Sequence, residues 1–395
     1  MGINIKNNVY WVGKNDWELR KFHGDQMSTA HGSTYNSYLI KDEKNVLIDS
    51  VWQPFIKDFM SNLRAEIDPA NLDYIIAQHA EPDHSGALPH IIAMKPDIPV
   101  FCTKMGVRSL KGHYHQDWNF QEVKTGDKLN IGSRELVFIE APMLHWPDTL
   151  MTYLPGENIL FSNDVFGQHF SSEFMYDDEV PAEALDYEAL KYYVNIVSPF
   201  SKKVAPALKS IEDQGIEIDM IAPAHGMIWR EKASQIIEKY AAYADNYSED
   251  RITILYDTMY ESTRRMAEAI ADGIREASPA TTVSLYNGSK YDGSDILTDI
   301  FRSKGVLVGS PTVNNGVLKS VTALLDEMIN LGLGGKKAAA FTSYGWSPGS
   351  LKYMNEMLEK GGFELAAKGI KVNWAPDQDA LDNCRKFGRE FAESF

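Results

Sequence analysis

Short apolar runs separated by polar turns dominate the chain as far as about residue 250. Their length and their content of β-branched and aromatic residues predict buried strands. These runs cover residues 45–49, 73–77, 135–139, 158–162 and 219–223. Helical patterns between them are few before residues 231–247, so the first part of the chain is predicted to be rich in strands.

After Arg251 the pattern changes to a regular alternation of strands and amphipathic helices. The strands are predicted at residues 251–256, 282–286, 305–309, 337–341 and 368–372. This alternation is typical of a doubly wound parallel sheet of the flavodoxin-like kind, which binds ligands at the carboxyl ends of its strands. The polar stretch 247–251 separates the two patterns. We therefore expect two domains, residues 1–249 and 250–395, and the length of 395 residues suits two cores.

Charge and cysteine content narrow the function. The formal net charge of −16 argues against nucleic acid or an anionic membrane as a partner. The only cysteines, Cys102 and Cys384, form no C-x-x-C pair, so a metal would have to be held by histidine and carboxylate. The first residues lack a signal peptide, Lys6 does not fit a myristoylation motif, and no apolar run is long enough to span a bilayer. We expect a cytoplasmic protein.

Candidate metal ligands follow the predicted strands. The segment Gln78–Gly86 contains His79, Glu81, Asp83 and His84, and a loop leaving a strand can point alternate side chains toward one centre. Three further candidates, His145, Asp164 and His225, lie at or beyond the ends of later strands. Four histidines and three carboxylates form an oxygen-rich set, which suits redox-active iron better than zinc. Other histidines, such as His90, His113, His115 and His169, are interpreted as ordinary surface or core residues.

The order H-x-[EH]-x-D-H, followed by His, Asp and His, resembles the metallo-β-lactamase superfamily. Most zinc hydrolases of that fold carry His where this chain carries Glu81, and the Glu version is the hallmark of flavodiiron proteins. The resemblance covers essentially the whole chain and implies an α/β fold, an αββα sandwich followed by a flavodoxin-like domain. It implies that His79, Glu81 and His145 bind one iron, that Asp83, His84 and His225 bind the other, and that Asp164 bridges both.

The same resemblance implies a His and a Tyr near the open coordination positions of the irons. His23 and Tyr193 match them in rough spacing and are the catalytic candidates, with Tyr192 competing with Tyr193. A packed aromatic residue remains an alternative for each.

A second set of motifs resembles an FMN site. After the strand at 251–256, hydroxyls and backbone amides at a helix start can hold a monoester phosphate without a Walker lysine. Two later loops follow strands in the way that the ring-flanking loops of flavodoxin-like domains do. The FMN candidates in the three loops are Thr258, Met259, Tyr260, Ser262 and Thr263; Ser310, Pro311, Thr312, Asn314, Asn315 and Gly316; and Ser343, Tyr344, Gly345 and Trp346. Trp346 is the first candidate to pack near the flavin ring and Tyr344 the second.

The resemblance implies an oxidoreductase in which FMN passes electrons to the irons, which reduce dioxygen, nitric oxide or both. No rubredoxin-like or NAD-binding extension follows Phe395, so a separate rubredoxin, flavin reductase or reduced deazaflavin is expected as donor. A head-to-tail homodimer, or a dimer of dimers, is implied as well. A zinc hydrolase of the glyoxalase type and a metal-free carrier or sensor module remain as alternatives. Glu81 and the second domain argue against the hydrolase, and the complete ligand set argues against the metal-free module.

Overall fold

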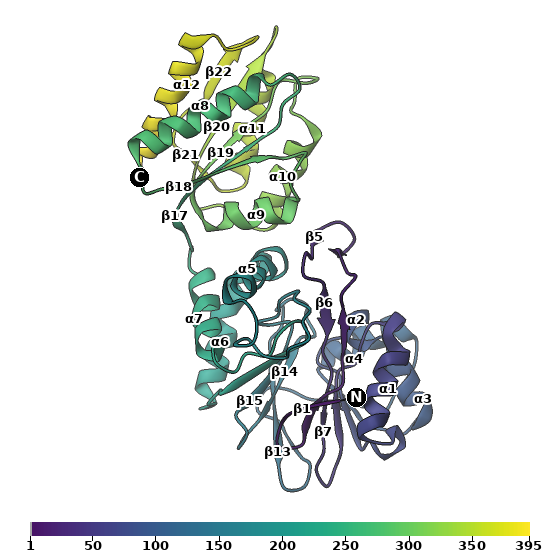
Figure 1. Ribbon diagram of the computed structural model, residues 1–395. Helices are drawn as coiled ribbons and strands as arrows, with labels where there is room; N and C mark the ends of the chain where they lie inside the picture. The colour runs from purple at the N-terminus through teal and green to yellow at the C-terminus, as the bar shows by residue number, and fades with distance from the viewer. Residues whose placement is uncertain (1) are drawn as a thin grey trace. The chain divides into compact units, whose positions relative to one another are not determined.

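The protein divides into two compact units in a computed structural model that describes residues 2–395 (Figure 1). The first unit extends to Arg20 and continues over Thr29–Ala244, and the second combines Lys21–Ser28 with Asp245–Phe395. In the described part of the chain, no helix is both long and apolar enough to cross a membrane.

Two sheets form the centre of the first unit. The larger sheet has the order β1 (Ile3–Lys6), β2 (Val9–Trp11), β7 (Tyr38–Ile40), β8 (Val46–Ile48), β9 (Tyr74–Ile76), β10 (Val100–Cys102) and β11 (Phe120–Glu122). The smaller has the order β12 (Lys128–Asn130), β13 (Glu135–Glu140), β14 (Leu150–Leu154), β15 (Ile159–Asn163) and β16 (Met220–Pro223). A separate pair joins β3 (Lys14–Asp16) to β6 (Ser33–Tyr35).

Apolar faces of these sheets pack against each other and against helices. One core contains side chains of both sheets, such as Ile48 and Phe161, and a second core sets the larger sheet against helices through residues such as Phe59 and Ile91. The helices are α1 (Ile56–Glu66), α2 (Pro82–Ser85), α3 (Leu88–Met94), α4 (Lys104–Tyr114), α5 (Ala182–Tyr192), α6 (Val204–Asp213) and α7 (Ala233–Tyr243). This is the layered arrangement of the αββα sandwich (Figure 1).

The expectation of few helices before residue 231 was wrong, because α1 to α6 all precede it. Each of them is short, and a helix that covers a sheet needs only a narrow apolar stripe. In α1, for example, Phe59, Met60 and Leu63 are buried among polar neighbours. So short a stripe gives little periodic signal in the sequence. All the strands predicted in this part of the chain are confirmed, as β8, β9, β13, β15 and β16.

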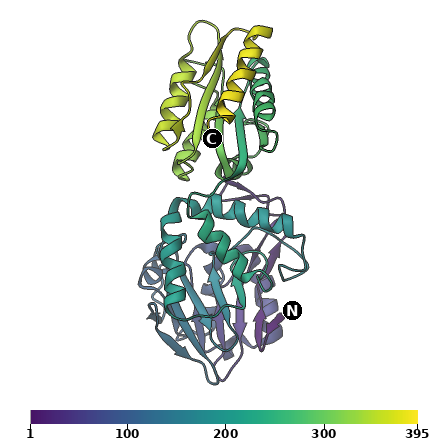
Figure 2. The same ribbon diagram turned by 90° about the vertical axis from the view of Figure 1, so that its left-hand side faces the viewer.

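The second unit is a doubly wound sheet. Its order is β18 (Thr282–Asn287), β17 (Glu249–Tyr256), β19 (Ser303–Gly309), β20 (Lys337–Tyr344) and β21 (Glu364–Leu365), and β22 (Ile370–Asn373) also pairs with β20. The strands are parallel, and β17, which comes first in this sheet along the chain, lies between the second and third strands, β18 and β19, as in flavodoxin-like folds. Helices cover both faces: α8 (Ser262–Ala277) and α12 (Gln378–Ala392) lie on one side of the sheet in Figure 2, opposite α10 (Lys319–Asn330) and α11 (Gly349–Lys360).

A hairpin distant in sequence completes the second unit. It consists of β4 (Lys21–Phe22) and β5 (Met27–Ser28) and lies at the start of α9 (Gly293–Arg302). Lys21 pairs with Asp292, and the backbone N–H of Ser28 donates to Oγ of Ser294 at 3.1 Å. Asp292 also caps α9 by accepting the N–H of Ser294 at 3.0 Å. The hairpin and the helix cap therefore share one polar network.

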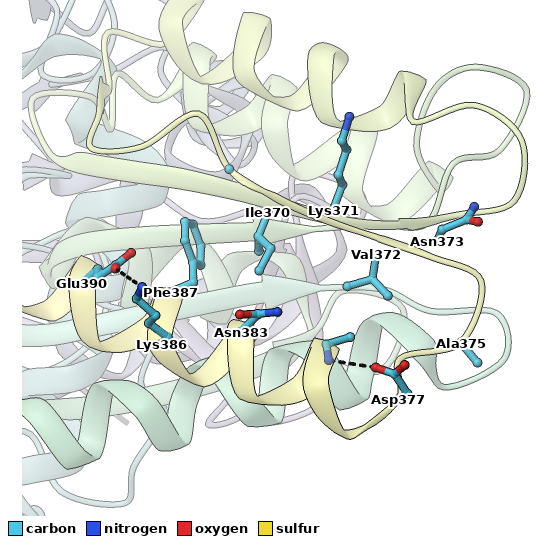
Figure 3. A pocket seen from close by; sticks show the side chains of 12 residues that line it. Ile370, Lys371, Val372, Asn373, Ala375, Asp377, Asn383, Lys386, Phe387 and Glu390 are labelled. Carbon is cyan, nitrogen blue, oxygen red and sulfur yellow. Dashed lines mark hydrogen bonds and ion pairs between the residues drawn. The ribbon is translucent and has the colours of Figure 1, made fainter.

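A groove of about 560 Å³ lies between β22 and α12 (Figure 3). Polar side chains of the helix line it, including Lys386, which pairs with Glu390 at 3.6 Å. Asp377 at its end caps α12 by accepting the N–H of Ala380 at 2.9 Å. All of its lining residues fall within 369–390, outside the three loops predicted to bind FMN.

Candidate functional site

Strand ends of both sheets bring the predicted metal ligands together. His79 and Glu81 follow β9, Asp83 and His84 lie on the short helix α2, and His145 lies between β13 and β14. Asp164 follows β15 directly, and His225 follows β16. Ligand atoms of His79, Glu81, His84 and Asp164 lie within 4.8 Å of one another, as do those of Asp83, His84 and His225.

The two carboxylate oxygens of Asp164 divide the cluster into two groups. Oδ2 lies 3.6 Å from Nε2 of both His79 and His145. Oε2 of Glu81 lies 3.2 Å from Nε2 of His79 and 3.4 Å from Nε2 of His145. Oδ1 lies 3.2 Å from Nε2 of His84 and 3.6 Å from that of His225. The carboxylate of Asp83 faces this second pair at 3.4 Å and 3.2 Å. Each group therefore contains two imidazoles and one carboxylate, with Asp164 between them.

Burial and unused acceptor atoms make this cluster suitable for metal. Asp164 is 1% exposed, and both oxygens of Asp83 and Oδ2 of Asp164 are buried without a hydrogen-bond donor within bonding geometry. A buried carboxylate without a partner is costly, and a bound cation removes that cost. Imidazole and carboxylate donors together fit iron, and the groups on either side of Asp164 fit one ion each.

The electrostatics of the cluster also favour a cation. Burial opposes a proton on His79, but Asp148, Glu81 and Asp164 outweigh it and raise the pKa of His79 to about 10. Burial likewise opposes protonation of His84, whereas the charges of Asp164 and Asp83 raise its pKa to about 10. Burial alone would raise the pKa of Asp164, yet the surrounding histidines hold it well below its usual range. The carboxylates favour positive charge at this site, and bound metal ions can supply it in place of protons on the histidines.

Residues that the sequence analysis did not single out orient the ligands. Asp148 accepts from Nδ1 of His79 at 3.3 Å and from the N–H of Ala80 at 2.8 Å. Nδ1 of His225 donates to the carbonyl of Thr34 at 2.6 Å. Both contacts turn Nε2 of the imidazole toward the cluster, which is how proteins commonly orient metal-binding histidines. Asp148 lies only three residues after His145, and this spacing could have identified Asp148 as a candidate from the sequence. The role of the Thr34 carbonyl could not be predicted, because every residue has a backbone carbonyl.

A buried carboxylate outside the cluster joins two of its strand ends. Asp49, just after β8, accepts the N–H of Gln78 at 2.8 Å and Nδ2 of Asn163 at 3.2 Å. Gln78 precedes His79, and Asn163 precedes Asp164. Asp49 therefore fixes the backbone on both sides of the cluster.

The two candidate tyrosines have different partners in the structure, and the catalytic role of Tyr193 stays a prediction. The hydroxyl of Tyr192 donates to Oδ1 of Asp164 at 3.0 Å, whereas that of Tyr193 lies 2.9 Å from Oγ of Ser201. Neighbouring helix residues point about 100° apart, so only one of the two can face the cluster. Tyr192, and not Tyr193, is therefore the tyrosine beside the candidate ligands. His23 lies exposed in the β4–β5 hairpin and stacks on Phe22, and its catalytic role stays a prediction.

The three predicted FMN loops follow neighbouring strands of the second unit, β17, β19 and β20. Oγ1 of Thr263 lies 3.0 Å from Oγ of Ser343, which links the first loop to the third. The N–H of Thr312 donates to the carbonyl of Ser343 at 3.1 Å, which links the second loop to the third. The candidate loop residues thus come together at the carboxyl edge of the sheet. Among them, Asn314 and Gly316 of the second loop line a cavity of about 620 Å³.

The first loop has the features of a phosphate site. Helix α8 is preceded by Glu261 in a left-handed conformation, with φ of 64°, and no side chain caps its first amides. Oγ1 of Thr258 is buried and has no hydrogen-bond partner among the described residues. Uncapped amides at a helix start and an unused hydroxyl fit an anionic group. Two aromatic candidates of these loops, Tyr260 and Trp346, are almost fully exposed, at 88% and 91%, so both rings are available for flavin or protein contact.

We expect Thr258→Val to weaken FMN binding by roughly ten- to a hundredfold, because a hydrogen bond to a charged group contributes about 1.5–3 kcal/mol. The fold should not lose stability, since the hydroxyl has no partner within the described protein. Quenching of FMN fluorescence during titration of the apoprotein measures the effect. Thr253→Val is the matched control, because its hydroxyl bonds inside the sheet, to Ser303 at 2.8 Å. Unchanged FMN affinity in Thr258→Val would show that this loop does not hold the phosphate.

Comparisons with known proteins agree with both units. Residues 34–226 match the family described as "ODP family beta lactamase", and residues 254–388 match the flavodoxin family. The anaerobic nitric oxide reductase flavorubredoxin of Escherichia coli O1:K1 is 49% identical over 397 aligned residues, which cover 100% of this chain and 83% of that protein.

Solved structures are similar to this chain over both units. The rubredoxin oxygen:oxidoreductase of Desulfovibrio gigas superposes with a TM-score of 0.96 at 34% identity, covering 100% of this chain and 98% of that chain. The flavodiiron protein of Giardia intestinalis gives 0.95 at 32% identity, covering 100% and 96%. The chain therefore belongs to the flavodiiron proteins, oxidoreductases with FMN in a flavodoxin domain and a non-haem di-iron site in a β-lactamase-like domain.

Proposed function

We propose that this protein reduces dioxygen to water, nitric oxide to nitrous oxide, or both. The observation that carries the proposal is the division of the cluster by Asp164 into two groups of two imidazoles and one carboxylate. Such a donor set would suit two iron ions, which would supply the redox chemistry that reduction of a diatomic gas needs. The names of the two relatives, a nitric oxide reductase and an oxygen oxidoreductase, are consistent with either gas.

The residues have distinct roles in this proposal. His79, Glu81 and His145 would hold one iron, Asp83, His84 and His225 would hold the other, and Asp164 would serve both. Asp148 and the carbonyl of Thr34 fix the orientation of His79 and His225, and Tyr192 holds Asp164 through its hydroxyl. When bound, FMN hydroquinone and two ferrous ions supply four electrons, which suffice for one dioxygen, and two of them suffice to couple two nitric oxides.

Electrons come from an external donor, which we propose to be a rubredoxin, a flavin reductase or a reduced deazaflavin. The name of the Desulfovibrio gigas relative supports a rubredoxin. We further propose that the protein acts in the cytoplasm as a head-to-tail homodimer or a dimer of dimers. The high negative charge favours donors with a basic contact surface.

The test is consumption of each gas by protein reconstituted with iron and FMN and then reduced without oxygen. We expect flavin and iron absorbance to show oxidation by dioxygen, by nitric oxide or by both, in proportion to the electrons added. Metal analysis and a flavin spectrum of the same sample identify the cofactors. Reduced, iron-loaded protein that stays reduced under both gases would overturn the proposal, and zinc with hydrolytic activity would support the hydrolase alternative.

A further inference from the structure

Two oxidisable side chains connect the candidate ligand His225 with the surface of the first unit. Tyr35, on β6, is only 2% exposed, and its ring lies edge-on to His225 with centroids 5.9 Å apart at 72°. Trp52 lies next to Tyr35, with ring centroids 6.1 Å apart, and is 40% exposed. The rings therefore form a continuous path from the ligand to solvent.

Tyr35 also has a fixed partner for its phenolic proton. Its hydroxyl donates to Oδ2 of Asp16 at 3.3 Å, and Asp16 is itself buried, at 7% exposure. The other oxygen of Asp16 accepts the N–H groups of Glu18 and Leu19 at 3.2 Å and 3.1 Å, which hold the carboxylate in place. A phenol gives up an electron far more readily when a base takes its proton at the same time. Asp16 supplies that base.

We propose that Tyr35 and Trp52 form an electron path from the surface to the metal centre, used when a reduced flavin has not delivered all the electrons that a bound dioxygen requires. This inference rests on the proposed reduction of dioxygen. The path would complete the reduction and spare the ligands from oxidation.

The transfer balances in single electrons and protons. Tyr35 gives one electron to the oxidised centre and its phenolic proton to Asp16, which leaves a neutral tyrosyl radical. The indole of Trp52 then reduces Tyr35, which takes the proton back from Asp16. At the surface, the oxidised Trp52 is reduced by one electron from a thiol in solution. Two thiols that have each given one electron then combine to form a disulfide. For each electron delivered, one thiol proton is released to water.

Trp146 is another indole close to a candidate ligand, with its ring centroid 4.9 Å from that of His79, and it is itself partly exposed. The route through Tyr35 differs from it in having a buried carboxylate fixed to accept a proton, since the Tyr35 hydroxyl lies 3.3 Å from Oδ2 of Asp16.

The test uses holoenzyme with iron and FMN in two samples. One sample is reduced completely, and the other receives half of the electrons that complete reduction requires. Both are then mixed with dioxygen in the absence of thiol. Oxygen uptake, freeze-quench EPR for aromatic radicals, and peptide mass spectrometry for oxidised tryptophan are recorded together. We expect oxidation at Trp52 only in the half-reduced sample. In Tyr35→Phe, which keeps the ring beside His225, we expect this oxidation to disappear while oxygen uptake by the fully reduced variant is unchanged.

Trp17 is the internal control, because it is more exposed than Trp52, at 52%. Oxidants that diffuse through solution would modify Trp17 at least as much as Trp52, which would overturn the path. Equal oxidation of Trp52 with and without the Tyr35 hydroxyl, or oxidation confined to Trp146, would overturn it as well. In Trp52→Phe we expect a longer-lived tyrosyl signal, since its electron donor is gone. Absence of oxygen uptake by fully reduced wild-type protein would overturn the proposed function, and the path with it, whereas uptake without these signals overturns the path alone.

Discussion

Asp164→Ala is expected to lose iron from both positions of the cluster, whereas Glu81→Ala keeps much of the iron held by Asp83, His84 and His225. The reason is geometric, because the oxygens of Asp164 lie 3.2–3.6 Å from imidazole nitrogens in both groups. Those of Glu81 face only His79 and His145. Removing the shared carboxylate also leaves the positive charge of both irons less compensated.

Iron and FMN are measured in the two purified variants by elemental analysis and absorption. FMN content should change little in either, because the flavin loops belong to the other unit. Circular dichroism confirms that both variants are folded. Equal loss of iron from Asp164→Ala and Glu81→Ala would contradict the bridging role of Asp164.

Activity is expected to return when a chain that cannot bind FMN is combined with a chain that cannot bind iron. The head-to-tail dimer implied by the family resemblance would let the FMN of one chain serve the irons of the other. Residues 244–248 are all that joins α7 to β17, and they enter β17 at Glu249. The flavin loops begin beyond Tyr256, about 26 Å away for a strand of this length. A two-fold dimer can bring such sites together across its interface.

Ser262→Asp provides the flavin-deficient chain, since a carboxylate suits a helix start but repels a phosphate there. Asp83→Ala with Asp164→Ala provides the iron-deficient chain. Mixed dimers, isolated by two different affinity tags, are assayed for gas reduction beside each parent. Mixed dimers contain one working pair of sites if electrons cross between chains, so part of the activity returns. Mixed dimers as inactive as both parents would show that electrons stay within one chain.

Strands were the most predictable part of the fold, because their signal is local. The apolar run at 45–49 became β8, all of whose residues are buried, and the alternation after Arg251 became the parallel sheet of the second unit. The helices before residue 231 were missed, because each buries a short stripe that tertiary packing, and not periodicity, selects.

Convergence of the candidate ligands could be predicted because each of them lies at or beyond the end of a strand, where a rigid sheet holds loops that carry polar groups. His79 follows β9 of the larger sheet, and Asp164 follows β15 of the smaller sheet. Contacts from elsewhere in the chain could not be predicted. Tyr192 reaches Asp164 from a helix, where one residue of difference in sequence turns a side chain away, and Thr34 contributes only its backbone carbonyl.

The β4–β5 hairpin has a consequence for how this protein can be divided in the laboratory. A gene fragment that starts at residue 245 would encode every strand and helix of the flavodoxin-like sheet, yet it would lack the partners that Lys21 and Ser28 provide at the start of α9. A fragment that ends at residue 244 would carry the same hairpin without the helix it contacts. The second unit therefore does not correspond to one continuous stretch of the gene. An exchange of flavodoxin-like units between relatives requires residues 21–28 to be exchanged together with residues 245–395.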